Sequence, residues 1–131
     1  MREGTLPHRY EQPRLAGRGG MGEIYVARDR ELERTVAIKV LDERFAEDRD
    51  LRARFTREAL AAARLSDEPH VVTIFDVGEW HGRPFIVMEH LGGGTLAERA
   101  ASGPLPPEEA LGLLEQVAAA LDAAHARGVL H

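Results

Sequence analysis

Short apolar runs, separated by charged or glycine-containing stretches, occupy most of residues 10–89. The runs are rich in β-branched and aromatic side chains, which suit the half-buried surface of a strand. Pro13 weakens the first run, because proline cannot donate a hydrogen bond to a neighbouring strand. Glu79-Trp80-His81-Gly82 has the length and the glycine of a hairpin turn. The pattern predicts strands at residues 10–17, 23–27, 35–41, 71–77 and 83–89.

Apolar residues spaced three and four positions apart predict a helix over residues 48–65. Its buried face is expected at Leu51, Phe55, Ala59 and Ala62. This helix falls between the third and fourth predicted strands.

After residues 92–94, all glycine, the pattern becomes helical. Thr95 and Glu98 have the capping-box spacing, in which each side chain satisfies the other's backbone donor, so a short helix to about Ala101 is expected. A longer helix should begin at Pro106-Pro107-Glu108-Glu109, since proline is tolerated and acids are favourable in a first turn. Arg127 and Gly128 are typical of its end. Its apolar stripe comprises Ala110, Leu113, Leu114, Val117, Leu121 and Ala124.

Composition indicates one soluble globular unit: 131 residues, 44% hydrophobic and 30% charged. No apolar run is long enough for a membrane span, and the absence of cysteine excludes disulfides and thiolate metal sites and fits a cytoplasmic protein. The net charge is −5, with arginines dispersed among acids, which disfavours a nucleic-acid partner. No histidine has a nearby acid at helical spacing, so no metal site is expected.

Lys39 is the only lysine beside 16 arginines, and it ends the run Val36-Ala37-Ile38-Lys39. Lysine is a compact point charge that can settle between phosphate oxygens, a position that a planar guanidinium cannot take in the same way. Upstream lies Gly17-Arg18-Gly19-Gly20-Met21-Gly22-Glu23-Ile24, a glycine-rich loop. Loop and lysine together point to a nucleotide phosphate site.

The glycine spacing G-x-G-x-x-G also occurs in dinucleotide-binding folds, but there it opens a helix. Here a predicted strand follows Gly22, and the Gly-Lys-Ser/Thr of a Walker loop is absent. The remaining possibilities are a hairpin whose glycine tip covers a triphosphate, with glycine letting the backbone approach the oxygens, or a flexible surface hairpin.

Glu58 and the strand at residues 85–89 each allow a functional and a purely structural interpretation. Glu58 should project beside the buried face of its helix, where a carboxylate needs a partner: Lys39, or Arg54 or Arg57 on the same helix. The strand at Phe85-Ile86-Val87-Met88-Glu89 runs into glycines. It is either the wall of a pocket for a flat base or a plain core strand.

Together these segments resemble the eukaryotic-type protein kinases, and in particular the bacterial serine/threonine kinases. Gly17 to Ile24 resembles the G-x-G-x-x-G-x-V loop, Val36 to Lys39 the V-A-I-K strand, and Glu58 the glutamate that pairs with this lysine. The resemblance implies an α+β protein-kinase-like fold: a five-stranded antiparallel N-lobe sheet with one helix (the family's αC), then the first helices (αD and αE) of a helical C-lobe. It divides the chain into a flexible lead-in (1–9), an N-lobe with hinge (10–91) and the start of a C-lobe (92–131).

The same resemblance implies roles for individual residues in binding ATP. Backbone N–H groups of Gly17, Gly19, Gly20 and Gly22 would cover the phosphates, and Lys39 would contact the α- and β-phosphates while Glu58 orients it.

Other residues would receive the adenine. Ile24 and Ala37 would pack on the base, with Met88 behind it. The Glu89 carbonyl and the Leu91 backbone would make the hinge hydrogen bonds, so the side chains there could vary. Ala16 stands where the family usually has a larger aliphatic residue.

His131 resembles the histidine of the family's catalytic loop, so the chain looks truncated before the catalytic aspartate and the Mg²⁺ ligands. The resemblance implies a parent enzyme that transfers phosphate from ATP to protein Ser/Thr hydroxyls, with this stretch alone inactive. A nucleotide-binding pseudokinase and a non-nucleotide interaction protein remain as alternatives. The residues beyond His131 would distinguish a pseudokinase from the enzyme. Binding of an ATP analogue would distinguish the interaction protein from both.

Overall fold

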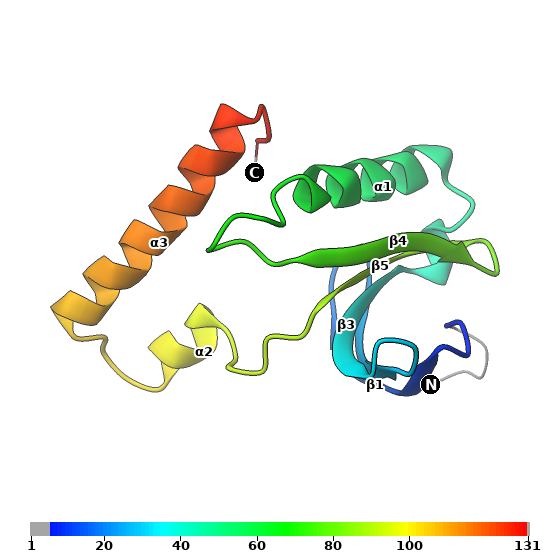
Figure 1. The fold of residues 1–131 in the computed structure, drawn as a ribbon, viewed down its shortest axis with the longest axis horizontal. Coiled ribbons are helices and arrows are strands. Elements are labelled where there is room, and N and C mark those ends of the chain that lie inside the picture. The colour runs from blue at the N-terminus through cyan, green and yellow to red at the C-terminus, as the bar shows by residue number, and fades with distance from the viewer. Residues whose placement is uncertain (1–5, 131) are drawn as a thin grey trace.

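The computed structural model describes residues 6–130. A five-stranded antiparallel sheet carries one long helix on one face, and an extended segment leads from it to two further helices (Figure 1). The sheet order is β1-β2-β3-β5-β4. The elements are β1 (Tyr10–Arg18), β2 (Gly22–Asp29), β3 (Arg34–Leu41), the 3-10 helix η1 (Glu43–Phe45), α1 (Arg49–Ala63), β4 (Ile74–Trp80), β5 (Arg83–Glu89), α2 (Leu96–Ala101) and α3 (Pro107–Ala126).

The five expected strands and three expected helices are all present, and the predicted α+β fold is confirmed. The largest shift concerns β4, which was expected over residues 71–77 but begins at Ile74 and runs to Trp80. The expected four-residue turn after it was wrong. Its turn consists of His81 and Gly82 alone, both with positive φ (51° and 76°), which is the conformation that two-residue hairpins require. The 3-10 helix η1 was not expected.

One face of the sheet is closed by the N-terminal segment. A buried cluster joins Leu6, and Tyr10 of β1, to side chains of β2, β3 and β5. Its remaining buried members are Tyr25, Ala27, Val36, Ile38, Val40, Phe85 and Val87. Leu6, in the expected flexible lead-in, is only 6% exposed and packs in this cluster; residues 1–5 lie outside the described part of the chain.

The N-terminal segment is also held by a buried carboxylate. Asp29, at the end of β2, is 1% exposed and accepts two hydrogen bonds from the Arg9 guanidinium, at 2.9 and 2.8 Å. It also accepts the backbone N–H groups of Glu31 and Leu32. The Arg9 hydrogen bond, as the largest influence, holds the pKa of Asp29 below its ordinary value.

The other face of the sheet carries α1. Phe55 and Ala59, both 2% exposed, pack on Leu41 and Ile86, as expected from the helical spacing. Asp48 caps the helix by accepting the N–H groups of Asp50 and Leu51. In Figure 1, α1 lies over β4 and β5; Ile24 of β2, on the same face, is 37% exposed, so this part of the face is partly open.

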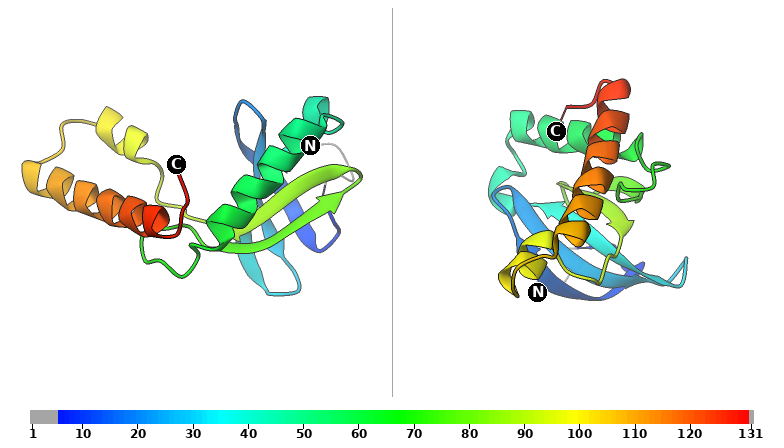
Figure 2. Two further views of the ribbon diagram at one scale, coloured as in Figure 1. Left: turned by 90° about the horizontal axis from the view of Figure 1, so that it is seen from above. Right: turned by 90° about the vertical axis from the view of Figure 1, so that its left-hand side faces the viewer.

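The two C-terminal helices form a separate part of the molecule (Figure 2). The expected capping box at Thr95 and Glu98 is present, and Gly128, with φ 75°, ends α3 as expected. The α3 stripe is only partly covered: Leu114 is 65% and Val117 49% exposed, whereas Ala124 is buried. Within residues 6–130, no helix is both long enough and apolar enough to traverse a membrane.

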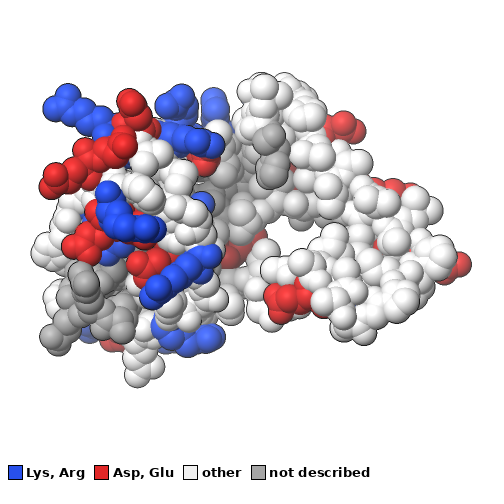
Figure 3. All heavy atoms as spheres, turned by 180° about the vertical axis from the view of Figure 1, so that it is seen from behind, with Lys and Arg blue, Asp and Glu red and all other residues white. Residues whose placement is uncertain are grey.

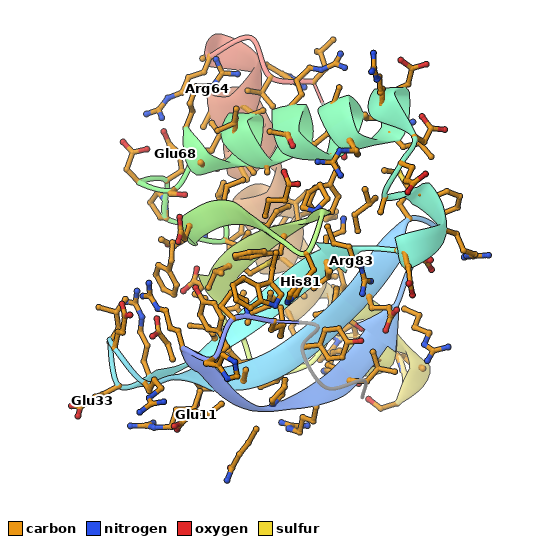
Figure 4. The ribbon with its side chains drawn as sticks, turned by 90° about the vertical axis from the view of Figure 1, so that its right-hand side faces the viewer. Glu11, Glu33, Arg64, Glu68, His81 and Arg83 are labelled. Atoms are coloured by element: carbon orange, nitrogen blue, oxygen red, sulfur yellow. The ribbon has the colours of Figure 1, made fainter. Side chains whose placement is uncertain are left out.

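One ionic contact joins these helices to the α1–β4 loop. The Arg127 guanidinium donates to the carboxylate of Asp67 at 2.9 and 3.2 Å and to the carbonyl of Arg64, and lies 3.1 Å from Glu68. Arg64 and Glu68 mark this loop at the end of α1 in Figure 4. The Arg127 hydrogen bond lowers the pKa of Asp67.

Candidate functional site

The strand register gathers four of the expected site residues on one face of the sheet. Ile24 pairs with Lys39, and Lys39 with Ile86. Two residues further along each strand, Val26 pairs with Ala37, and Ala37 with Met88. Directly paired residues of antiparallel strands lie on the same face. Ile24, Ala37, Lys39 and Met88 are therefore neighbours, on the face opposite the Tyr10 cluster.

The glycine-rich loop is the hairpin between β1 and β2. The Gly19 N–H donates to the Gly22 carbonyl at 2.8 Å across its tip, and the Met21 carbonyl accepts the N–H of Asp42. A Cβ at Gly22 would lie 2.2 Å from the Val40 carbonyl oxygen, so this glycine permits the close approach of β2 to β3.

The other glycines of the hairpin have a different environment. A Cβ built on Gly17 or Gly20 would meet nothing within 4 Å, and one on Gly19 would only touch the Gly22 carbonyl oxygen at 4.0 Å. Packing within residues 6–130 therefore does not explain these three glycines. Ala16, exposed, occupies the bulge between the Leu15 and Gly17 pairings.

Lys39 lies near the C-terminal end of β3, half-buried, between Ile24 and Ile86. Its Nζ lies 5.8 Å from the ring centre of Phe55 on α1, within the range of a cation–π contact. No carboxylate among residues 6–130 lies within ion-pair distance of this ammonium. Lys39 is thus a cation on a largely apolar face.

The expected contact between Lys39 and Glu58 is not formed. Glu58, whose side chain is 60% exposed, instead accepts a hydrogen bond from Arg54 at 3.2 Å. The reason lies in the helix geometry: Phe55 and Ala59 direct their side chains to the sheet, and Glu58 is rotated away with the solvent-facing arginines. The structure therefore has the alternative partner named above, an arginine on the same helix.

The hinge follows β5. Met88 packs against the cluster of Phe55 and Ile86, and Leu91 is 66% exposed. The Glu89 side chain, which was expected to be able to vary, makes a specific contact in this structure. Its Oε1 accepts the backbone N–H of Thr73 at 2.8 Å, a tertiary contact between residues far apart in sequence, which no local pattern could reveal.

An opening separates the sheet part from the helical part when the molecule is viewed as spheres (Figure 3). The blue Lys and Arg side chains in this view gather over the sheet part, while the helical part shows mostly uncharged atoms and scattered acids. Within residues 6–130, no three His, Asp or Glu side chains are placed to hold a metal ion together.

Comparison with known proteins agrees with this arrangement. Residues 10–131 match the family described as the protein kinase domain. The chain belongs to this family. The kinase relatives include the serine/threonine-protein kinase PknE of Mycobacterium bovis, 47% identical over 131 residues, and PknD of Mycobacterium tuberculosis, 47% identical over 123 residues. The matches cover 99% and 93% of this chain but only 23% and 18% of those proteins.

Solved structures place the chain in the first part of a kinase domain. The kinase domain of Mycobacterium tuberculosis PknI superimposes with a TM-score of 0.80 at 36% identity, over all of this chain and 54% of that structure. The expected fold, an N-lobe with the start of a C-lobe, and the resemblance to serine/threonine kinases are confirmed. The individual site residues stay predictions.

Proposed function

We propose that this kinase-domain chain forms the ATP-binding part of a serine/threonine protein kinase, which transfers the γ-phosphate of ATP to Ser/Thr hydroxyls of proteins in the cytoplasm. The observation that carries the proposal is the position of Lys39. It is the sole lysine of the chain, and it lies on the partly open face of the sheet, paired with Ile24 next to the glycine hairpin.

The hairpin suits a triphosphate. The space around Gly17 and Gly20 would let the backbone N–H groups come close to phosphate oxygens. The Lys39 ammonium has no carboxylate partner among the described residues, so a phosphate would supply the counter-charge that it lacks. In this proposal Lys39 holds the α- and β-phosphates.

The adenine would lie on the neighbouring apolar residues. Ala37 is small and Ile24 is 37% exposed, so both offer surface to a flat ring, with Met88 behind it. The Glu89 carbonyl and the Leu91 backbone would bind the edge of the base. Mg²⁺ would neutralise phosphate charge when bound, and we place its ligands outside the described residues.

Glu58 has a conditional role in the proposal. It would orient Lys39 only after α1 turns its Glu58 face towards β3, exchanging Arg54 for the lysine. The Arg54–Glu58 pair also favours a second candidate, a nucleotide-binding pseudokinase that transfers no phosphate. Transfer of labelled phosphate by the longest protein that contains this chain, lost on Lys39→Arg, supports the enzyme; wild-type rates in that variant contradict the role of Lys39.

The binding of a fluorescent ATP analogue to this chain tests the proposal directly. Lys39→Met should weaken binding by at least about tenfold, as expected for the loss of one charge-assisted contact. Arg28→Met, which removes an exposed cation of β2, is the matched control and should bind as the wild type does. Equal affinities of wild type and Lys39→Met would refute the site.

A further inference from the structure

Both backbone groups of Thr73 are bonded to one residue, Glu89. The Thr73 carbonyl accepts the Glu89 N–H at 2.9 Å, as in a sheet, but the Thr73 N–H donates to the Glu89 carboxylate at 2.8 Å. In a regular antiparallel pair this N–H would return to the Glu89 carbonyl. The carboxylate therefore takes the place of the carbonyl, and sheet pairing ends at this point.

Thr73 is itself fixed to the turn that follows α1. Ser66 accepts the Ile74 N–H on its hydroxyl at 2.9 Å, and the Thr73 hydroxyl donates to the Ser66 carbonyl at 3.4 Å. Leu65, the residue before Ser66, is 6% exposed. A continuous set of contacts thus connects the turn that follows α1, through Ser66 and Thr73, to the carboxylate of Glu89.

We propose that the side chain of Glu89 is a positioning residue for the base-binding edge of the site. By accepting the Thr73 N–H, the carboxylate leaves the Glu89 carbonyl out of the exchange with Thr73 and available to an amino group of a bound base. It also fixes the chain direction where β5 leads into the hinge. This inference rests on the proposed ATP site, because it assigns a role in recognising the base.

The inference separates base recognition from phosphate recognition. Glu89→Leu removes the acceptor while keeping a side chain of similar size, whereas Glu89→Gln keeps an oxygen at the same reach. Affinity for a fluorescent ATP analogue should fall about tenfold in the leucine variant, in keeping with the loss of one well-placed hydrogen bond. The glutamine variant should recover most of that affinity.

Inorganic tripolyphosphate, which lacks a base, provides the second arm. Its affinity, measured by displacement of the analogue and by calorimetry, should be the same in wild type and both Glu89 variants. Glu79→Leu, on β4 at the other end of the same hairpin, is the matched control and should bind both ligands as the wild type does.

The outcomes distinguish the two proposals. Wild-type protein that binds neither ATP nor tripolyphosphate overturns the ATP site and this inference with it. ATP binding in Glu89→Leu equal to wild type, or an equal loss of ATP and tripolyphosphate binding, overturns the positioning role alone. Amide hydrogen exchange covers the case of a leucine variant that does not fold: the Thr73 amide should be protected in wild type and Glu89→Gln, and rapid wild-type exchange refutes the contact.

Discussion

The Glu58 carboxylate accepts its hydrogen bond from Arg54, one turn back on α1, at 3.2 Å. Exposed ion pairs of this spacing stabilise a helix by only about 0.3–0.5 kcal/mol. Burial of Phe55 and Ala59 contributes several times more. The position of α1 on the sheet is therefore set by its apolar contacts, and the Arg54–Glu58 pair follows from that position.

Removing Arg54 should accordingly have little effect on stability. We expect Arg54→Gln to change the free energy of unfolding, measured in urea, by less than about 0.5 kcal/mol. A loss several times larger would mean that the ion pair, and not the packing, holds the helix.

Phe55→Ala should be strongly destabilising. The ring is 2% exposed in the cluster with Leu41 and Ile86, and such truncations cost about 3–5 kcal/mol through lost burial and the cavity left behind. Leu60→Ala on the same helix is the control, since Leu60 is 54% exposed. Urea unfolding of both variants makes the comparison, and similar losses would contradict the assigned orientation of α1.

The Arg9–Asp29 contact should make stability fall in acid. The pKa of Asp29 is lowered in the folded protein, chiefly by the Arg9 hydrogen bond, so its contribution is present above the ordinary carboxyl pKa and is lost as pH falls through the lower folded value. The loss is expected below about pH 4. Unfolding midpoints measured between about pH 2.5 and about pH 6 should fall less on acidification in Asp29→Asn than in the wild type.

A matched variant identifies the source of that fall. Asp122→Asn removes an exposed carboxylate of α3 and should keep the wild-type acid dependence. If Asp29→Asn and the wild type lose stability in parallel on acidification, the buried carboxylate is not responsible.

Two glycines of the β1–β2 hairpin should respond differently to alanine. Gly22→Ala places a Cβ 2.2 Å from the Val40 carbonyl and should cost at least about 1–3 kcal/mol, as overpacking does. Gly20→Ala meets nothing within 4 Å, so the melting temperature should hardly change, while affinity for an ATP analogue should fall if the backbone approaches the phosphates there. Thermal unfolding and analogue binding, measured on both, test this contrast; unchanged stability in Gly22→Ala would refute the close approach.

Local sequence determined the elements of this protein. The capping box at Thr95 and the end of α3 at Gly128 depend on side-chain period and backbone preference within a few residues, and these were predicted correctly. The strands and helices were predicted as well, except for the bounds of β4, the turn after it and the helix η1. Only the tertiary structure decided which partner a polar side chain takes. Glu58 had Lys39 and two arginines within conceivable reach, and packing of Phe55 and Ala59 turned it to Arg54.

The same reason explains Glu89 and the N-terminal segment. The Glu89 carboxylate meets Thr73, and Arg9 meets Asp29, across 16 and 20 positions of sequence. Such contacts depend on how strands and loops are brought together in space. The sequence thus determined which residues could carry a nucleotide site. The fold decided that Lys39 lies on the partly open face without a carboxylate partner among the described residues. The physical reason is that an ion pair forms only where the packing of helix and sheet brings the two charged groups close together.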